Sequence, residues 1–173
     1  IEEKCLNDCT NLASKKELLK NKSQKPLIST EAKSALEAAD LIIYGPGTQH
    51  SSLLPSYLTE GLGETISNNS FADKIFIANT RMDYEIQGET VKSLCLKLHY
   101  YLNRKGETKS LPENLVNRYF FQNPKKLQIK KKDQLELELE SFDFPSRQTL
   151  ITDWESDSGK HSGNRVLDEL IAI

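Results

Sequence analysis

One short segment of the chain combines glycine, hydroxyl and amide groups in a pattern that could bind an anion. It follows an apolar stretch and reads Gly45-Pro46-Gly47-Thr48-Gln49-His50-Ser51-Ser52. Glycine can adopt backbone angles closed to other residues and lets backbone N–H groups approach a ligand, while proline stiffens the turn. A helix expected directly after the segment would add unpaired N–H groups and the positive end of its dipole. We therefore predict a phosphate site formed by Gly45, Pro46, Gly47, Thr48, Ser51 and Ser52. The alternative is a simple turn whose serines cap the helix.

Asn79 and Thr80 follow a second apolar stretch, Lys74–Ala78. If both stretches are neighbouring parallel strands, the amide of Asn79 would face the same crevice as Gly47, because ligands bind beyond the carboxyl ends of such strands. We include Asn79 and Thr80 in the predicted ligand site, with Arg81 as a weaker candidate. The alternative is that they are ordinary turn residues.

The three histidines have different expected roles. His50 lies in the glycine segment, where it could donate a hydrogen bond or a proton to a phosphate, although no carboxylate is placed to orient it. His161 precedes the last helix in a loop that could return to the crevice. We expect a structural role for His99, which lies on a long helix beside two tyrosines. The catalytic residues stay unassigned.

The sequence gives no strong metal motif. Asp83, Glu85 and Glu89 could hold Mg²⁺ beside phosphates, but their spacing fits no known metal loop, so a solvated acidic loop is the preferred reading. Cys5 and Cys9 lack a second Cys/His pair at zinc-finger spacing. We expect no metal site.

Alternating apolar strands and helices must position these residues. The expected elements are a helix over Glu31–Ala39, a strand over Asp40–Tyr44, a helix from Leu53 to about Ile66, a strand over Lys74–Ala78, a helix over Thr90–Asn103, strands over Asn114–Phe121 and Gln148–Trp154, and a helix over Asn164–Ile173. The short β-branched run at Asp40–Tyr44 is typical of a strand buried on both faces. In a further segment Leu135, Leu137 and Leu139 alternate with glutamates, which indicates a half-exposed strand.

This order predicts an α/β fold: a three-layer Rossmann-like domain with a mainly parallel sheet. Antiparallel strands toward the C-terminus stay open. We expect a polar N-terminal lead-in over residues 1–28 and the α/β domain over residues 29–173. The competing reading is an α+β fragment whose sheet is completed by a missing N-terminal half or by a partner chain.

Composition excludes some classes of partner. The formal net charge is −2 and the pI is about 6.0, whereas a nucleic-acid surface needs clustered positive charge. Ala38–Tyr44, among the longest apolar stretches, is far shorter than a bilayer span of about 20 residues. We therefore expect no nucleic-acid or membrane partner and a cytoplasmic location.

The glycine segment carries a resemblance to a known family. Residues Ala39–Pro55 resemble the ADLI-x-x-GPGS-x-x-(T/S)S-x-LP motif of the CofD/YvcK-like family, the 2-phospho-L-lactate transferases and the bacterial proteins that look like them. Lys74–Thr80 resembles the strand and Asn that follow in the family, and Gln87–Val91 its next helix start. Lys160–Gly163 is a looser likeness to an Arg-His-Asp segment. The resemblance covers about Thr30–Gln122.

The resemblance implies a phosphorylated, nucleotide-type ligand at the GPGT loop, and a transferase of phosphorus-containing groups that would use Mg²⁺. The alternative it implies is a non-catalytic, nucleotide-sugar-binding regulator of the YvcK-like type. The family's GGGTG loop is absent, since Ile1–Thr30 contains no glycine. Together with the start at Ile1, this indicates either the C-terminal portion of a longer family member or a reduced relative that has lost half the active cleft. The expected partner is a second copy of the chain in a homo-oligomer or the missing N-terminal portion. Whether the chain is an enzyme stays open.

Overall fold

Four short strands rich in β-branched and aromatic residues form one parallel sheet in the computed structural model, which describes residues 3–123, 135–138, 148–154 and 160–172. The strands are β1 (Leu41–Tyr44), β2 (Asp73–Ile77), β3 (Arg118–Gln122) and β4 (Gln148–Thr152), in the order β1-β2-β3-β4. Ile43 aligns with Ile75 in the first pair of strands, and Phe120 aligns with Leu150 in the last. Because every pair is parallel, the carboxyl ends of all four strands meet at one edge of the sheet.

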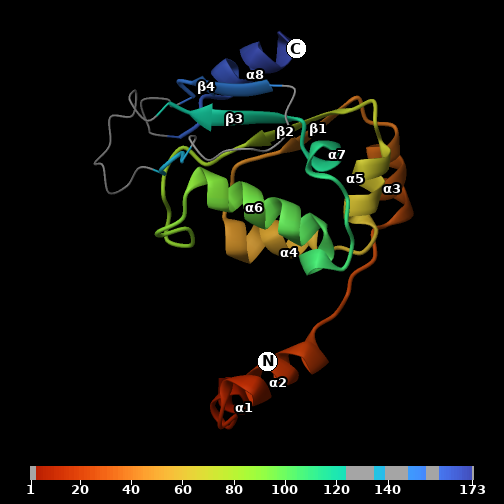
Figure 1. The fold of residues 1–173 in the computed structure, drawn as a ribbon, viewed down its shortest axis with the longest axis vertical. Coiled ribbons are helices and arrows are strands. Elements are labelled where there is room, and N and C mark those ends of the chain that lie inside the picture. Colours follow the sequence, from red (N-terminus) through yellow and green to blue (C-terminus); the bar gives the residue numbers. More distant parts are fainter. Residues whose placement is uncertain (1–2, 124–134, 139–147, 155–159, 173) are drawn as a thin grey trace.

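Helices connect and flank these strands (Figure 1). They are α1 (Glu3–Asn7), α2 (Leu12–Lys22), α3 (Thr30–Glu37), the π-helical turn η1 (Gln49–Leu53), α4 (Leu54–Tyr57), α5 (Leu62–Asn68), α6 (Val91–Leu102), the 3₁₀ turn η2 (Arg104–Gly106), α7 (Pro112–Leu115) and α8 (Gly163–Ile171). Local sequence fixes their starts: Ser29 accepts a hydrogen bond from the Ala32 N–H before α3, and Thr90 and Ser93 form a capping box at α6.

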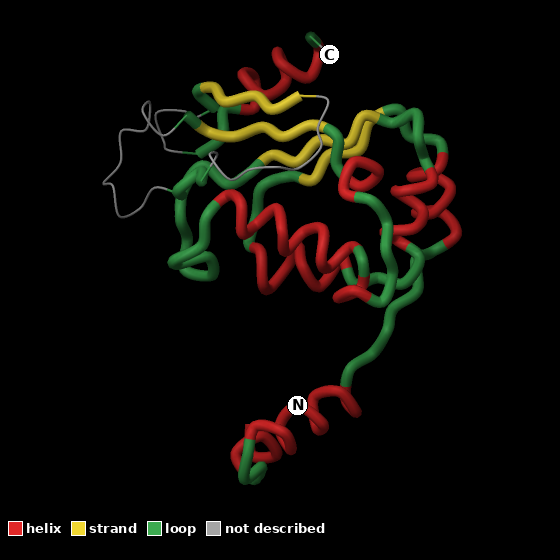
Figure 2. The backbone as a smooth tube through the Cα atoms, viewed as in Figure 1, coloured by secondary structure: helices red, strands yellow, loops and turns green. Residues whose placement is uncertain are grey.

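Apolar side chains on both faces of the sheet make a three-layer fold, as predicted (Figure 2). The larger cluster joins α4 and α6 to one face of the sheet through residues such as Leu54, Leu98 and Phe76. On the other face, Val166 and Leu170 of α8 pack against a cluster that contains Trp154. Trp154 is fully buried, and its ring stacks on that of Phe120 at 5.3 Å between centroids.

Strand β1 is not buried on both faces, so that prediction is wrong. Ile42 and Tyr44 are buried, but Leu41 and Ile43 are 41% and 44% exposed. Strand β1 lies at one edge of the described sheet. The helix α8 lies on the same face of the sheet as Ile43, but it packs against the cluster that contains Trp154 and so does not cover Ile43. A continuous apolar run therefore does not by itself reveal which strands lie in the centre of a sheet.

Other expected elements also differ from the structure. The helix expected from Leu53 to Ile66 is divided into α4 and α5, with Gly61 between them at φ 85°, a left-handed angle that favours glycine. The third strand begins at Arg118, because Pro112 instead starts the short helix α7. Antiparallel strands do not occur among the described strands, which are all parallel.

The Leu/Glu alternation also forms no strand within its described part, residues 135–138. There Glu136 makes a single parallel bridge to Thr90, and Leu135 is buried. Leu139 lies outside the described residues. At the other end of the chain, α1 and α2 stand apart from the sheet in Figure 1, and α2 has no buried residue. Among the helices that the structure describes, none has both the length and the apolar character needed to span a bilayer.

Candidate functional site

The glycine segment lies where strand β1 ends, at the carboxyl edge of the sheet. Its glycines do not need glycine-only backbone angles, so that part of the prediction is wrong. The described glycines with positive φ are Gly61, Gly88 and Gly106, not Gly45 or Gly47. A Cβ atom on Gly47 would lie 3.5 Å from Leu53 Cδ1, an ordinary contact.

Asn79 holds this loop in place from the end of the next strand. Its Nδ2 donates to the Gly47 carbonyl oxygen at 3.1 Å, and its Oδ1 accepts from Gln49 Nε2 at 3.1 Å. Gln49 is buried, with 3% of its surface exposed. The proximity of Asn79 and Gly47 is as expected from parallel neighbouring strands, and the amide of Asn79 is engaged with the loop.

A cavity of about 570 Å³ opens beside this loop. It is lined by Pro46, Gly47, Asn79, Thr80, Arg81, Met82, Asp83, Lys160 and His161. Four of the predicted ligand-binding residues are thus on its wall, together with Arg81 and His161. Lys160 is a lining residue that the prediction of site residues did not include, although it begins the Lys160–Gly163 segment singled out in the sequence. The two cations, Arg81 and Lys160, outnumber the carboxylate of Asp83, so this wall favours an anion.

His161 fastens the loop before α8 to the sheet. Its Nε2 lies 2.9 Å from the carbonyl oxygen of Ala78, directly after β2. Because a carbonyl can only accept, Nε2 carries the proton. Burial lowers the pKa of His161, against the opposing effect of this hydrogen bond, and so favours the neutral imidazole. His161 therefore brings Lys160 to the cavity while making its own bond to the backbone.

The predicted hydroxyl donors lie apart from the residues that line this cavity. Thr48 Oγ1 and Ser52 Oγ share a hydrogen bond of 2.8 Å, and Ser51 Oγ is 3.5 Å from Ser52 Oγ. All three residues are exposed. Neither they nor Gly45 are among the lining residues. The predicted residues thus fall into two sets. One set lines the cavity, and the other, Thr48, Ser51 and Ser52, is exposed at the start of the helix.

The carboxylate of Glu85 occupies that helix start. Its Oε2 accepts hydrogen bonds from the backbone N–H groups of His50, at 2.8 Å, and Ser51, at 3.1 Å. Hydrogen bonds from the Ser51 hydroxyl and from these N–H groups lower the pKa of Glu85. Glu85 was expected to lie in a solvated acidic loop, and nothing in the spacing of the sequence indicates that it caps the glycine segment from 34 residues away.

The other titratable candidates lie elsewhere. His50 Nε2 is 3.5 Å from Lys97 Nζ, and Lys97 forms an ion pair with Glu89. His99 is buried with its Nε2 2.9 Å from the hydroxyl oxygen of Tyr119, and burial lowers its pKa to about 4. His99 thus packs in the core, as a structural residue that is more deeply buried than a surface or half-buried position.

The described residues also do not fit a dedicated metal site. Within that part of the chain, no three His, Cys, Asp or Glu side chains gather closely enough to hold an ion. Asp83 lines the cavity, but its Oδ1 already accepts from the backbone N–H groups of Glu85 and Ile86, at 2.8 and 3.2 Å.

Comparisons with known proteins place this geometry in context. The model of the family described as "2-phospho-L-lactate transferase CofD" matches residues 7–152. A curated protein of Halalkalibacterium halodurans, named "Gluconeogenesis factor", is 38% identical over 65 residues, which are 38% of this chain and 19% of that protein.

Solved structures share the fold over most of the chain. A crystal structure of a UPF0052 family member from Bacillus halodurans has a TM-score of 0.66 at 17% identity and covers 84% of this chain and 46% of that one. A second crystal structure of the same Bacillus halodurans protein has a TM-score of 0.66 at 21% identity, with coverages of 87% and 48%. The chain thus matches about half the length of the solved relatives and about a fifth of the curated one.

Proposed function

Because the chain belongs to the CofD family, we propose that it binds a phosphorylated, nucleotide-type ligand in the cavity beside the glycine loop. The observation that carries the proposal is the composition of the cavity wall. Lys160 and Arg81 supply positive charge, and Gly47 lines the cavity without a side chain of its own. A phosphate group is a common ligand of a cationic wall.

The position of the cavity supports the same ligand class. Gly47 follows β1 and Asn79 follows β2, so the cavity lies outside the carboxyl ends of two adjacent parallel strands. Open α/β sheets bind their ligands at this edge. A volume of about 570 Å³ falls within the range of roughly 300–1,000 Å³ that is usual for small-molecule sites.

Within this proposal the chain's own residues bind and orient. Lys160 and Arg81 line the cavity and supply positive charge that attracts a phosphate group. Asn79 keeps the Gly47 carbonyl engaged, so the loop presents a fixed backbone to the ligand. Thr80, 5% exposed, lines the same wall.

Two activities of the ligand-bound protein are candidates. The family description favours transfer of a phosphorus-containing group, in which a hydroxyl of an acceptor attacks the phosphorus of a nucleotide-linked donor. The name of the curated relative, a gluconeogenesis factor, favours a regulatory protein. In that case the chain would bind a nucleotide sugar without reaction. We also propose a cytoplasmic location, which is compatible with either activity.

Isothermal titration calorimetry on the full chain tests the binding proposal. The ligands are inorganic phosphate, a purine and a pyrimidine nucleoside diphosphate, and a nucleotide sugar. We expect saturable binding of at least one nucleotide, with inorganic phosphate as a competitor. Absence of binding by all four compounds would overturn the proposal. A phospholactyl-transfer assay on a binding-competent sample then separates the two activities, because only a transferase releases nucleotide from the donor.

A further inference from the structure

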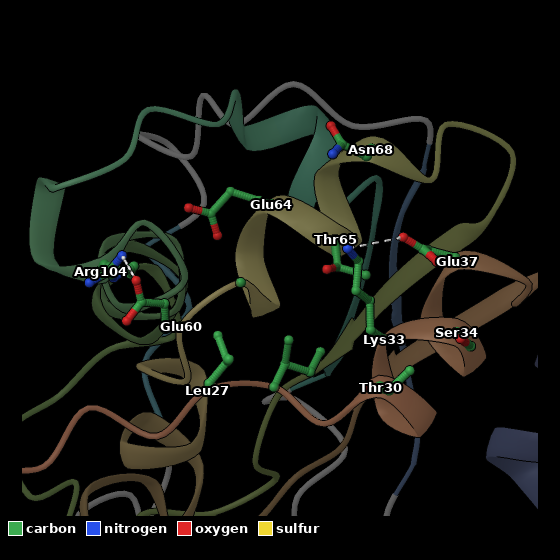
Figure 3. Close-up of a pocket in the computed structure, with 12 residues that line it drawn as sticks. Leu27, Thr30, Lys33, Ser34, Glu37, Glu60, Glu64, Thr65, Asn68 and Arg104 are labelled. Carbon is green, nitrogen blue, oxygen red and sulfur yellow. Dashed lines mark hydrogen bonds and ion pairs between the residues drawn. The ribbon is translucent and has the colours of Figure 1, made fainter.

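A second cavity, of about 710 Å³, lies between α3, α5 and the turn η2 (Figure 3). The lining residues are Leu27, Ile28, Thr30, Lys33, Ser34, Glu37, Glu60, Gly61, Glu64, Thr65, Asn68 and Arg104. Helices α3 and α5 pack side by side and precede β1 and β2 along the chain, so this cavity lies toward the amino ends of the strands (Figure 1). It is therefore distinct from the cavity beside the glycine loop.

Backbone hydrogen bonds build one wall of this second cavity. The segment before α3 runs alongside Glu60, where the Ile28 N–H donates to the Glu60 carbonyl at 3.0 Å. The Glu60 N–H in turn donates to the carbonyl of Pro26 at 2.8 Å. This pairing fixes Leu27 and Ile28 at the cavity, where they provide apolar surface.

Most charged side chains of the wall are paired with one another. Lys33 Nζ lies 3.8 Å from Glu37 Oε1, and Arg104 Nη1 lies 3.4 Å from Glu60 Oε1 (Figure 3). Arg104 also pairs with Glu107 at 2.9 Å. These two cations therefore already have carboxylate partners.

Glu64 differs from these carboxylates. It lies in the first turn of α5, and its Oε2 is shielded from solvent without a hydrogen-bond partner among the described residues. Figure 3 shows the side chain extending from α5 toward the side of the cavity where Arg104 lies, without a dashed line to any neighbour. A shielded carboxylate oxygen without a donor is costly, because it loses its hydration without compensation. A bound group with N–H donors and a positive charge would supply what this oxygen lacks.

We propose that this cavity is a binding site for a small organic cation whose primary ammonium group donates to Glu64. The apolar part of the ligand lies against Leu27 and Ile28. Hydroxyl and amide groups of Ser34 and Asn68 are available to polar substituents. An organic cation fits better than a metal ion, because the described residues provide no group of three metal-ligating side chains. One uncompensated carboxylate matches a ligand with one positive charge.

Hexylammonium and 1-hexanol form a matched pair of probes, since they share an apolar tail and differ in the charged head group. The measurement is a ¹H–¹⁵N correlation NMR titration of the full chain. We expect hexylammonium to cause saturable shifts in the amide signals of Ser34, Gly61, Glu64 and Thr65, and 1-hexanol to bind at least tenfold more weakly. Equal binding of both probes, or no saturable shift with hexylammonium, would overturn the proposal. The absence of a saturable shift is the result expected if only water solvates Glu64.

The variant Glu64→Gln tests the contact itself, because it keeps the shape of the side chain and removes its charge. We expect its affinity for hexylammonium to fall about tenfold, the usual effect of losing one charge-assisted hydrogen bond. Glu169→Gln in α8 makes the same change in net charge away from the cavity and should bind like the parent. An unchanged affinity in Glu64→Gln contradicts the proposal. The dispersion of the same NMR spectra verifies that each variant is folded.

Discussion

The carboxylate of Glu85 is hydrogen-bonded to the backbone of Ser51, with 3.1 Å between Oε2 and the amide nitrogen. The same oxygen accepts from the His50 N–H at 2.8 Å, so a negative group of the protein itself occupies the start of the helix that follows the glycine loop. Asp83 fixes the turn that carries Glu85 by accepting from the Glu85 N–H. An anion that used the N–H groups of His50 and Ser51 would have to displace Glu85.

We expect Glu85→Gln to bind inorganic phosphate about three- to fivefold more tightly than the parent, because the substitution removes a negative charge that would repel an anion at the N–H groups of His50 and Ser51. Competition calorimetry against a nucleotide measures this change. Glu113→Gln, an exposed substitution in α7, is the control for net charge. If the affinity of Glu85→Gln equals that of the parent, phosphate binds only on the wall formed by Gly47, Arg81 and Lys160.

Lys160→Gln should weaken the binding of a nucleoside diphosphate by about ten- to hundredfold, because a charge-assisted hydrogen bond contributes about 1.5–3 kcal/mol. The substitution removes a charge from the cavity wall and leaves the His161 bond to Ala78 in place. Lys20→Gln in the exposed helix α2 makes the same change in net charge away from the cavity. Equal losses in both variants would mean that only the overall charge of the protein matters, and the assignment of Lys160 to the site would be wrong.

The sequence predicted the core of the fold because its signals are local. The apolar runs that became β1 and β2, and the cap of Ser29 before α3, each depend on residues close together in the chain. Parallel pairing of the first two strands follows from the helices between them. The exposure of Leu41 and Ile43 could not be read in this way, since it depends on where α8 packs.

The sequence likewise predicted only part of the candidate site. The glycine segment and Asn79 are adjacent in space because parallel strands bring their carboxyl ends together, and that much follows from the order of elements. The contact of Glu85 with Ser51 depends on the path of a loop, which has no periodic pattern to read. The unpartnered oxygen of Glu64 could not be predicted either, because it depends on which charged side chains around the second cavity pair with one another.

We expect the stability of the protein to fall between pH 7 and pH 4 in a way that depends on His99. Burial lowers the pKa of His99 from 6.5 to about 4, so the unfolded chain binds a proton in this range and the folded chain does not. The linked loss is up to about 3 kcal/mol at pH 4. Because the folded pKa is depressed, this stabilisation is complete above pH 6.5 and declines as the pH falls.

The measurement is urea unfolding of the parent and of His99→Gln at pH 7 and pH 4.5. The variant retains a polar partner for the Tyr119 hydroxyl but cannot titrate, so its unfolding free energy should change less with pH. A smaller dependence should persist from His161, whose pKa burial also lowers. Equal slopes in parent and variant would show that His99 does not contribute to acid destabilisation.

Gly63→Ala should destabilise the fold strongly, because α5 passes directly against the end of α6. A Cβ atom on Gly63 would lie 2.1 Å from the carbonyl oxygen of Leu102, and a backbone atom cannot move aside as a flexible side chain can. Overpacking of this kind costs about 1–3 kcal/mol or more, offset in part by the higher helix propensity of alanine. The free energy of unfolding in urea should therefore fall by at least about 1 kcal/mol.

Gly45→Ala is the matched control for this prediction. No atom lies within 4 Å of a Cβ built on Gly45, and its φ is not positive, so alanine fits without strain. Its stability should stay within about 0.5 kcal/mol of the parent. Because Gly63 positions α5, Gly63→Ala should also shift the NMR signals of Glu64 and Thr65 in the second cavity, whereas Gly45→Ala should leave them unchanged. Equal stability of the two alanine variants would mean that α5 and α6 can separate at little cost, and that the close contact at Gly63 does not define the geometry of that cavity.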